Sequence, residues 1–91
     1  MAQATLVVKH EVADYNTWRS VYDSLDALRA EHGCTDEEVM VDPGDGQSVF
    51  ILHRFPTLDQ AQAFASSDGL REGMGRAGVK GAPRIEFAVE A

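Results

Sequence analysis

A chain of 91 residues is too short for two hydrophobic cores, so the sequence predicts a single domain over residues 1–91. Hydrophobic residues make up 44% of the chain and charged residues 25%, which is typical of globular proteins and argues against disorder. Eight basic against fifteen acidic side chains give a net charge of −7, which argues against nucleic acid and anionic membrane surfaces as partners.

The sequence also limits the compartment and the covalent chemistry. A single cysteine, Cys34, excludes a disulfide within the chain and provides no cluster of metal ligands. No basic segment followed by an apolar stretch, the pattern of a secretion signal, is visible at the N-terminus. No apolar run approaches the roughly 20 residues that cross a bilayer. We therefore expect a cytoplasmic protein.

Residues 4–12 (ATLVVKHEV) predict the first strand, because they are rich in β-branched side chains and alternate in polarity. Leu6, Val8, His10 and Val12 share one face of this strand. The face is apolar apart from the imidazole, so His10 is expected to point toward the core.

A helix is predicted over residues 15–32, with Asp14 as its N-cap and Gly33 just after its end. At about 100° per residue, one broad arc of this helix collects its large side chains. The arc consists of Tyr15, Trp18, Val21, Tyr22, Leu25, Leu28, Arg29 and His32. This face is expected to pack on a sheet.

Two strands follow. Residues 34–42 (CTDEEVMVD) predict an edge strand, in which Asp36, Glu37 and Glu38 form a solvated border. Pro43 and two glycines mark a turn. The next segment, SVFILHRF, is apolar on both faces, as expected of a central strand over residues 48–55. His53 and Arg54 point to opposite faces of it, so only one of them can face the helices.

The remainder predicts one more helix and one more strand. TLDQ (57–60), after Pro56, is a capping box for a helix over about residues 58–66. Three further segments are expected: a short helical turn through Leu70 and Met74, a loop over residues 75–83, and a final strand over residues 84–90.

The order β-α-β-β-α-β predicts an α+β, ferredoxin-like fold. In it, a four-stranded antiparallel sheet with strand order 4-1-3-2 carries two helices on one face. The opposite face of the sheet then lacks cover. A second copy of the chain could supply it, so we expect a homodimer with the two sheets packed face to face.

Three segments carry a family resemblance: HEVADYNTW (10–18), GLREGM (69–74) and AGVKGAPRIEF (77–87). With them the chain resembles the dimeric α+β-barrel superfamily, which includes cofactor-free antibiotic-biosynthesis monooxygenases and small polyketide cyclases, and within it a group of short bacterial proteins. The resemblance implies a pocket between sheet and helices in each subunit. That pocket would hold a small hydrophobic or aromatic ligand without a metal, flavin or other cofactor.

A haem-degrading role is not expected. Haem-degrading members of the superfamily carry Asn on the first strand, Trp near the end of the third strand and His on the second helix. The corresponding strands here hold His10 and Phe55, and no histidine follows residue 53. A metal site is not expected either, since His10 and His53 fall near opposite ends of neighbouring strands and His32 closes the helix.

The strongest catalytic candidate is His10, whose ordinary pKa of about 6.5 suits either general acid or general base chemistry. The alternative is a neutral core histidine bonded to the backbone or to a tyrosine. Trp18 and Tyr22 suit the wall of a pocket cut into the core, but plain core packing is the favoured interpretation, and Tyr15 is expected to be a rim or staple residue. Arg29 either binds a ligand anion or extends its charged end to water, and we favour the second interpretation.

The leading functional hypothesis is a cofactor-free monooxygenase or cyclase for an enolisable aromatic or polyketide-like substrate. In it, His10 moves a proton, while Tyr22 and an arginine stabilise the enolate. Arg54 is the preferred arginine. Four side chains are expected to bind substrate: Tyr15, Trp18, Arg29 and His53. The alternatives are a non-catalytic ligand-binding or stress-associated dimer and a structural accessory subunit.

Overall fold

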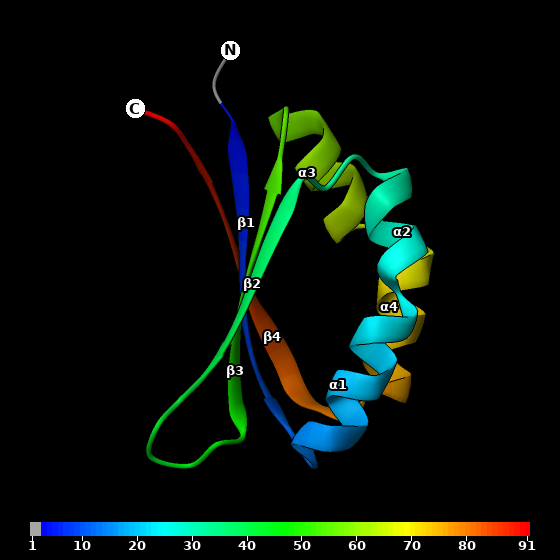
Figure 1. The fold of residues 1–91 in the computed structure, drawn as a ribbon, viewed down its shortest axis with the longest axis vertical. Coiled ribbons are helices and arrows are strands. Elements are labelled where there is room, and N and C mark those ends of the chain that lie inside the picture. The colour runs from blue at the N-terminus through cyan, green and yellow to red at the C-terminus, as the bar shows by residue number, and fades with distance from the viewer. Residues whose placement is uncertain (1–2) are drawn as a thin grey trace.

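The computed structural model describes residues 3–91, which form one antiparallel sheet with the helices on a single face (Figure 1). The strands are β1 (Ala4–Val12), β2 (Asp36–Val41), β3 (Ser48–Phe55) and β4 (Val79–Val89). The helices are α1 (Tyr15–Ser24), α2 (Asp26–Glu31), α3 (Leu58–Ala65) and α4 (Asp68–Arg76). The strand order β2-β3-β1-β4 is the predicted order read from the other edge. The ferredoxin-like α+β fold is therefore confirmed.

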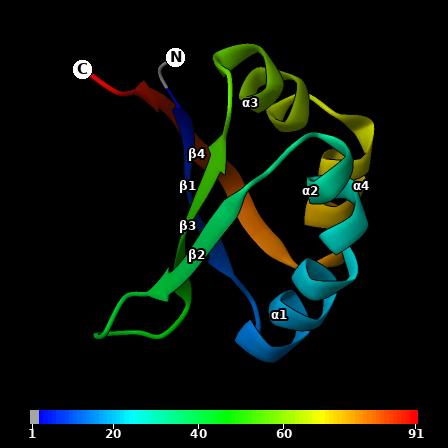
Figure 2. The ribbon, with the colours of Figure 1, turned by 45° about the horizontal axis from the view of Figure 1, so that its top comes forward.

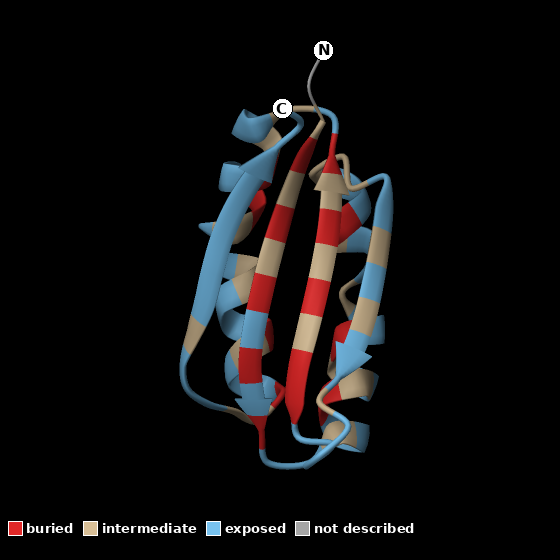
Figure 3. Ribbon diagram, turned by 90° about the vertical axis from the view of Figure 1, so that its left-hand side faces the viewer, coloured by how far each residue is buried: buried red, intermediate tan, exposed pale blue. Residues whose placement is uncertain are grey.

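The two central strands carry the core. Buried residues alternate with partly buried or exposed ones along β1, and with partly buried ones along β3 from Val49 onward, as Figure 3 shows from the side away from the helices. The buried set faces the helices, and its largest fully buried members include Leu6, Ile51 and Phe55. A second view shows α3 at one end of the helix layer and α1 at the other, with α2 and α4 between them (Figure 2). None of the helices within residues 3–91 is long and apolar enough to cross a membrane.

The single helix predicted over residues 15–32 is wrong, because the structure breaks it at Leu25. Two carbonyls that a continuous helix would use for its own bonds accept side-chain donors, and the Tyr22 carbonyl also accepts the Leu25 backbone N–H at 3.1 Å. The Ser24 hydroxyl donates to the Val21 carbonyl at 2.6 Å, and Arg29 Nη1 donates to the Tyr22 carbonyl at 2.7 Å. Side-chain bonds of this kind compete with the helical ladder and bend it.

The final strand begins earlier than predicted. Residues 75–83 were expected to be loop, but α4 continues to Arg76 and β4 begins at Val79. Lys9 pairs with Arg84 and Glu11 pairs with Lys80, so three residues of β4 lie opposite His10 alone. Gly81 (φ 70°) and Pro83 stand in this bulge, where both are tolerated on an edge strand. The irregularity hid the strand from its sequence pattern.

Helix α4 packs closely against α2 and against Leu25, the residue between α1 and α2. A Cβ atom on Gly73 would come within 2.5 Å of Leu25 Cδ1, and one on Gly69 within 3.1 Å of the Leu28 methyl carbons. The two glycines therefore form a shallow groove on α4 that accepts both leucines. This contact closes the helix layer over the middle of the sheet.

Candidate functional site

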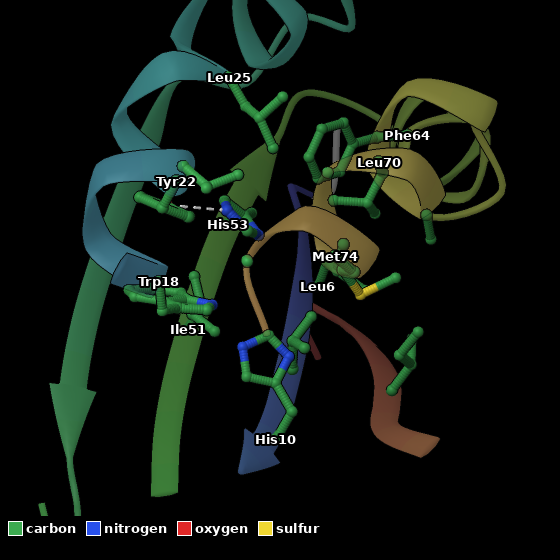
Figure 4. A pocket seen from close by; sticks show the side chains of 16 residues that line it. Leu6, His10, Trp18, Tyr22, Leu25, Ile51, His53, Phe64, Leu70 and Met74 are labelled. Atoms are coloured by element: carbon green, nitrogen blue, oxygen red, sulfur yellow. Dashed lines mark hydrogen bonds between the residues drawn. The ribbon is translucent and has the colours of Figure 1, made fainter. Parts of the chain in front are cut away.

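A small cavity of about 40 Å³ lies between the sheet and the helices. Strands β1 and β3 form its floor, and α1 and α4 form its roof (Figure 4). Its wall consists largely of apolar side chains. His10, Tyr22 and His53 also contribute to it, and they are the polar side chains on which the chemistry depends.

His10 is buried without any hydrogen bond. Its side chain extends from the apolar face of β1, the residue is only 6% exposed, and neither ring nitrogen has a partner within residues 3–91. The imidazole meets the Trp18 indole edge to face, with 5.7 Å between the ring centroids. Burial lowers the pKa of His10 to about 4, so the ring is neutral at pH 7. A buried polar group left without a partner costs about 1–3 kcal/mol, and both nitrogens are free to bond to a molecule in the cavity.

His53 is the second buried histidine of the cavity. It faces the helices from β3, where it pairs with Leu6, four positions along β1 from His10. Its Nε2 lies 2.9 Å from the Tyr22 hydroxyl, whereas its Nδ1 has no partner in the part of the chain that the structure describes. Burial, with the nearby positive charge of Arg29, lowers the pKa of His53 to about 4.

Tyr22 links His53 to a charged pair. Its hydroxyl donates to Glu37 Oε2 at 2.6 Å, so its oxygen is available to accept from a protonated Nε2 of His53. Burial and the bond to Glu37 raise the pKa of Tyr22, which keeps the phenol protonated. Arg29 Nε lies 2.7 Å from the same Glu37 oxygen, and the guanidinium stacks 4.0 Å from the centroid of the Tyr22 ring.

The arginine predictions need correction. The Arg29 side chain does not extend to water: it is 5% exposed and paired with Glu37. Arg54 lies on the other face of the sheet, where its Nη1 is 3.1 Å from carboxylates of Asp36 and Glu38. Of His53 and Arg54, His53 therefore faces the helices, and Arg54 does not reach the cavity.

The aromatic candidates divide into two groups. Trp18 and Tyr22 are stacked in the cavity wall with 4.8 Å between their centroids. Tyr15 is half-buried, with 5.8 Å between its ring centroid and that of Trp18, and it is not part of the wall.

Glu37 is predicted to belong to a solvated border, yet it lies beside His53 in the register of β2 and β3. Strand alternation combined with that register is the signal that could have identified it.

His10 and His53 are not placed to share a metal ion. Four positions along the strand direction separate their Cα atoms by roughly 13 Å. Within residues 3–91, no group of three or more His, Cys, Asp or Glu side chains is placed to hold a metal ion.

No protein-family model matches the sequence, and no curated protein matches it either. The fold, however, matches several solved structures. An antibiotic biosynthesis monooxygenase-like protein from Bordetella bronchiseptica superposes with a TM-score of 0.82 and 11% identity, covering 100% of this chain and 99% of that chain. A similar protein from Caulobacter crescentus gives a TM-score of 0.76 and 18% identity, with coverages of 96% and 88%.

SnoaB, a cofactor-independent oxygenase from Streptomyces nogalater, gives a TM-score of 0.74 at 13% identity, covering 100% of this chain and 93% of SnoaB. The chain thus shares its α+β fold with antibiotic biosynthesis monooxygenase-like proteins, as its sequence motifs predict. At these identities the likeness concerns the fold.

Proposed function

We propose that this protein is a cofactor-independent oxygenase acting on an enolisable aromatic compound held between the sheet and the helices. The observation that carries the proposal is His10, a buried neutral imidazole with two unpartnered nitrogens in the wall of an apolar cavity. The shared fold with SnoaB, a cofactor-independent oxygenase, supports the reaction class.

The proposed reaction begins with a proton transfer. A neutral imidazole can accept a proton from an acidic C–H or O–H of the substrate, and the resulting anion is electron-rich enough to react with O₂ directly. One oxygen atom is retained as a new carbonyl of the product. The second leaves as water with two substrate hydrogens, which are the CH₂ hydrogens of the reacting carbon in the keto tautomer and one C–H and one O–H hydrogen in the enol, so the reaction balances without an external reductant. An apolar wall strengthens each hydrogen bond to the developing anion.

The cavity must enlarge to hold such a substrate. Benzene occupies an engineered cavity of about 150 Å³, whereas this cavity measures about 40 Å³. Met74 of α4 lies in the wall and has three rotatable bonds, so it can move aside without a backbone shift. Ile85 of β4 lines the cavity and is 36% exposed, which supports an entrance between β4 and α4.

The bare face of the sheet supports a homodimer as the functional unit. Val7, Phe50 and Leu52 are only partly buried there, and Met40 is 45% exposed. Leu52→Glu places a charge in the middle of this face and is expected to halve the mass measured by light scattering at micromolar concentration. Ala63→Glu, on the exposed side of α3, is the matched control and should leave the mass at that of a dimer. A monomeric wild type would contradict the proposed assembly.

Oxygen uptake with a panel of hydroquinones and related enolisable aromatics tests the reaction. His10→Leu removes the base while nearly preserving side-chain volume, and we expect it to slow uptake about 100-fold or more. Gln62→Leu, on the exposed side of α3, should retain the wild-type rate. Equal rates for His10→Leu and wild type would remove His10 from the mechanism. Saturable binding of these compounds without oxygen uptake would instead identify a ligand-binding protein.

A further inference from the structure

The cavity has a hydrogen-bonded connection to solvent that begins at its second histidine. We propose that His53, Tyr22 and Glu37 form a proton relay between the cavity and bulk water. This inference rests on the proposed oxygenase function, because it assigns a route to the proton of an acidic O–H of the substrate, whereas His10 takes the proton from carbon.

The relay is continuous in the structure. His53 Nδ1 has no protein partner within residues 3–91 and belongs to a side chain of the cavity wall. His53 Nε2 is 2.9 Å from the Tyr22 oxygen, drawn as the dashed line in Figure 4, and the Tyr22 hydroxyl is 2.6 Å from Glu37 Oε2. The Glu37 side chain is 36% exposed, so the far end of the relay meets water. Both distances suit proton transfer.

The movement of protons along the relay balances. A substrate proton binds to His53 Nδ1, the proton on Nε2 passes to the Tyr22 oxygen, and the Tyr22 hydroxyl proton passes to Glu37. No bond between heavy atoms changes. One proton has then left the cavity and one negative charge remains on the substrate anion. When the oxygenated intermediate takes a proton back from Nδ1, each step reverses and the starting tautomer of His53 is restored.

The surroundings favour passage of the proton over its storage on the relay. The groups that face His53 are Tyr22 and Phe64, with the Arg29 charge nearby and Glu37 at the neighbouring position of β2. The Arg29 charge disfavours a persistent imidazolium, and burial disfavours a Tyr22 phenolate. Concerted transfer avoids both species.

Arg29 is the positioning residue of the relay. Its Nε forms an ion pair with Glu37 Oε2 at 2.7 Å, outside hydrogen-bond geometry, while its Nη1 donates to the Tyr22 backbone carbonyl, so one guanidinium contacts both Tyr22 and Glu37. His10 has no comparable connection, since neither of its nitrogens has a partner in the described part of the chain. The two histidines therefore have different roles: His10 must return its proton to the ligand, whereas His53 can exchange it with solvent.

Tyr22→Phe tests the relay by removing a single hydroxyl while keeping the ring that stacks on Trp18 and Arg29. Oxygen uptake should fall at least tenfold, and the dependence of rate on D₂O fraction should change from curved to linear as the multi-proton step is lost. Tyr15→Phe makes the same chemical change on the same helix, outside the cavity, and should behave as wild type. Identical rates and isotope responses in the two variants would overturn the relay.

The His53 tautomer supplies a readout that does not require turnover. ¹⁵N NMR of the wild type should show His53 protonated on Nε2 and bare on Nδ1, and Tyr22→Phe should shift that balance. A dominant Nδ1-protonated form would overturn the relay. In that form Nε2 carries no proton and could only accept one from the Tyr22 hydroxyl, whose single proton is already donated to Glu37. If no compound supports oxygen uptake, the oxygenase proposal fails while the tautomer still decides the relay.

Discussion

Acidification from pH 7.5 to pH 4 is expected to lower the free energy of unfolding by roughly 6 kcal/mol, about 3 kcal/mol for each buried histidine. Burial lowers the pKa values of His10 and His53 from 6.5 to about 4 in the folded state. Between these values the unfolded chain binds more protons than the folded one, so stability declines as the pH falls. Above about pH 7.5, one unit beyond the unfolded-state pKa, both histidines are neutral in both states and their contribution hardly depends on pH.

Urea unfolding at several pH values from 7.5 to 4 measures this loss, and His10→Leu isolates the share of one ring. The variant should lose about half of the pH-dependent difference. It should also be more stable than wild type at pH 7.5 by about 1–3 kcal/mol, because it removes two unpartnered buried nitrogens. Thr5→Leu controls for the addition of a leucine to β1. A variant with the full wild-type pH dependence would show that His10 is not the titrating group.

This expected gain in stability bears on function. A side chain that destabilises the folded protein and lies in a cavity wall is typical of a site that exchanges stability for activity. The paired prediction, in which the same His10→Leu variant is more stable and less active, separates catalytic loss from unfolding. It also distinguishes His10 from an ordinary core residue, whose replacement would lower stability.

The fold was readily predictable because its signals are local. Alternation over residues 4–12 and the two-sided apolar pattern over residues 48–55 give the central strands, and the element order gives the topology. The same alternation placed His10 on the inner face. The break at Leu25 was not predictable, because it depends on Arg29 reaching the Tyr22 carbonyl. Such a bond exists only once the helix is packed.

The rest of the site also depends on tertiary structure. Glu37 is one of three consecutive acidic residues, and nothing in that run marks it as different from Asp36 or Glu38. Its role appears when β2 pairs with β3, which places Glu37 beside His53 under the face of α1 that carries Tyr22. Arg29 is then drawn inward by the Glu37 carboxylate, a partner that its own helix does not reveal.

The ion pair between Arg29 and Glu37 gives the second large expected effect on stability. Glu37→Gln should lower the free energy of unfolding by about 3 kcal/mol, because it leaves the Arg29 charge buried without its carboxylate. The other carboxylate near Arg29 belongs to Asp26, at 3.7 Å, and it is 86% exposed, so it compensates little. Urea unfolding at pH 7.5, above the range in which the two histidines titrate, measures the change.

Glu38→Gln is the matched control, since it makes the same substitution one residue away and removes a carboxylate paired with the more accessible Arg54. It should cost less than about 1 kcal/mol. Arg29→Met should cost less than Glu37→Gln, because it removes the buried charge itself and leaves Glu37 able to contact water. The double variant Arg29→Met/Glu37→Gln should therefore recover part of the stability that Glu37→Gln loses. Additive losses in the double variant would show that the two charges are not coupled, and Arg29 would then have no positioning role beside Tyr22.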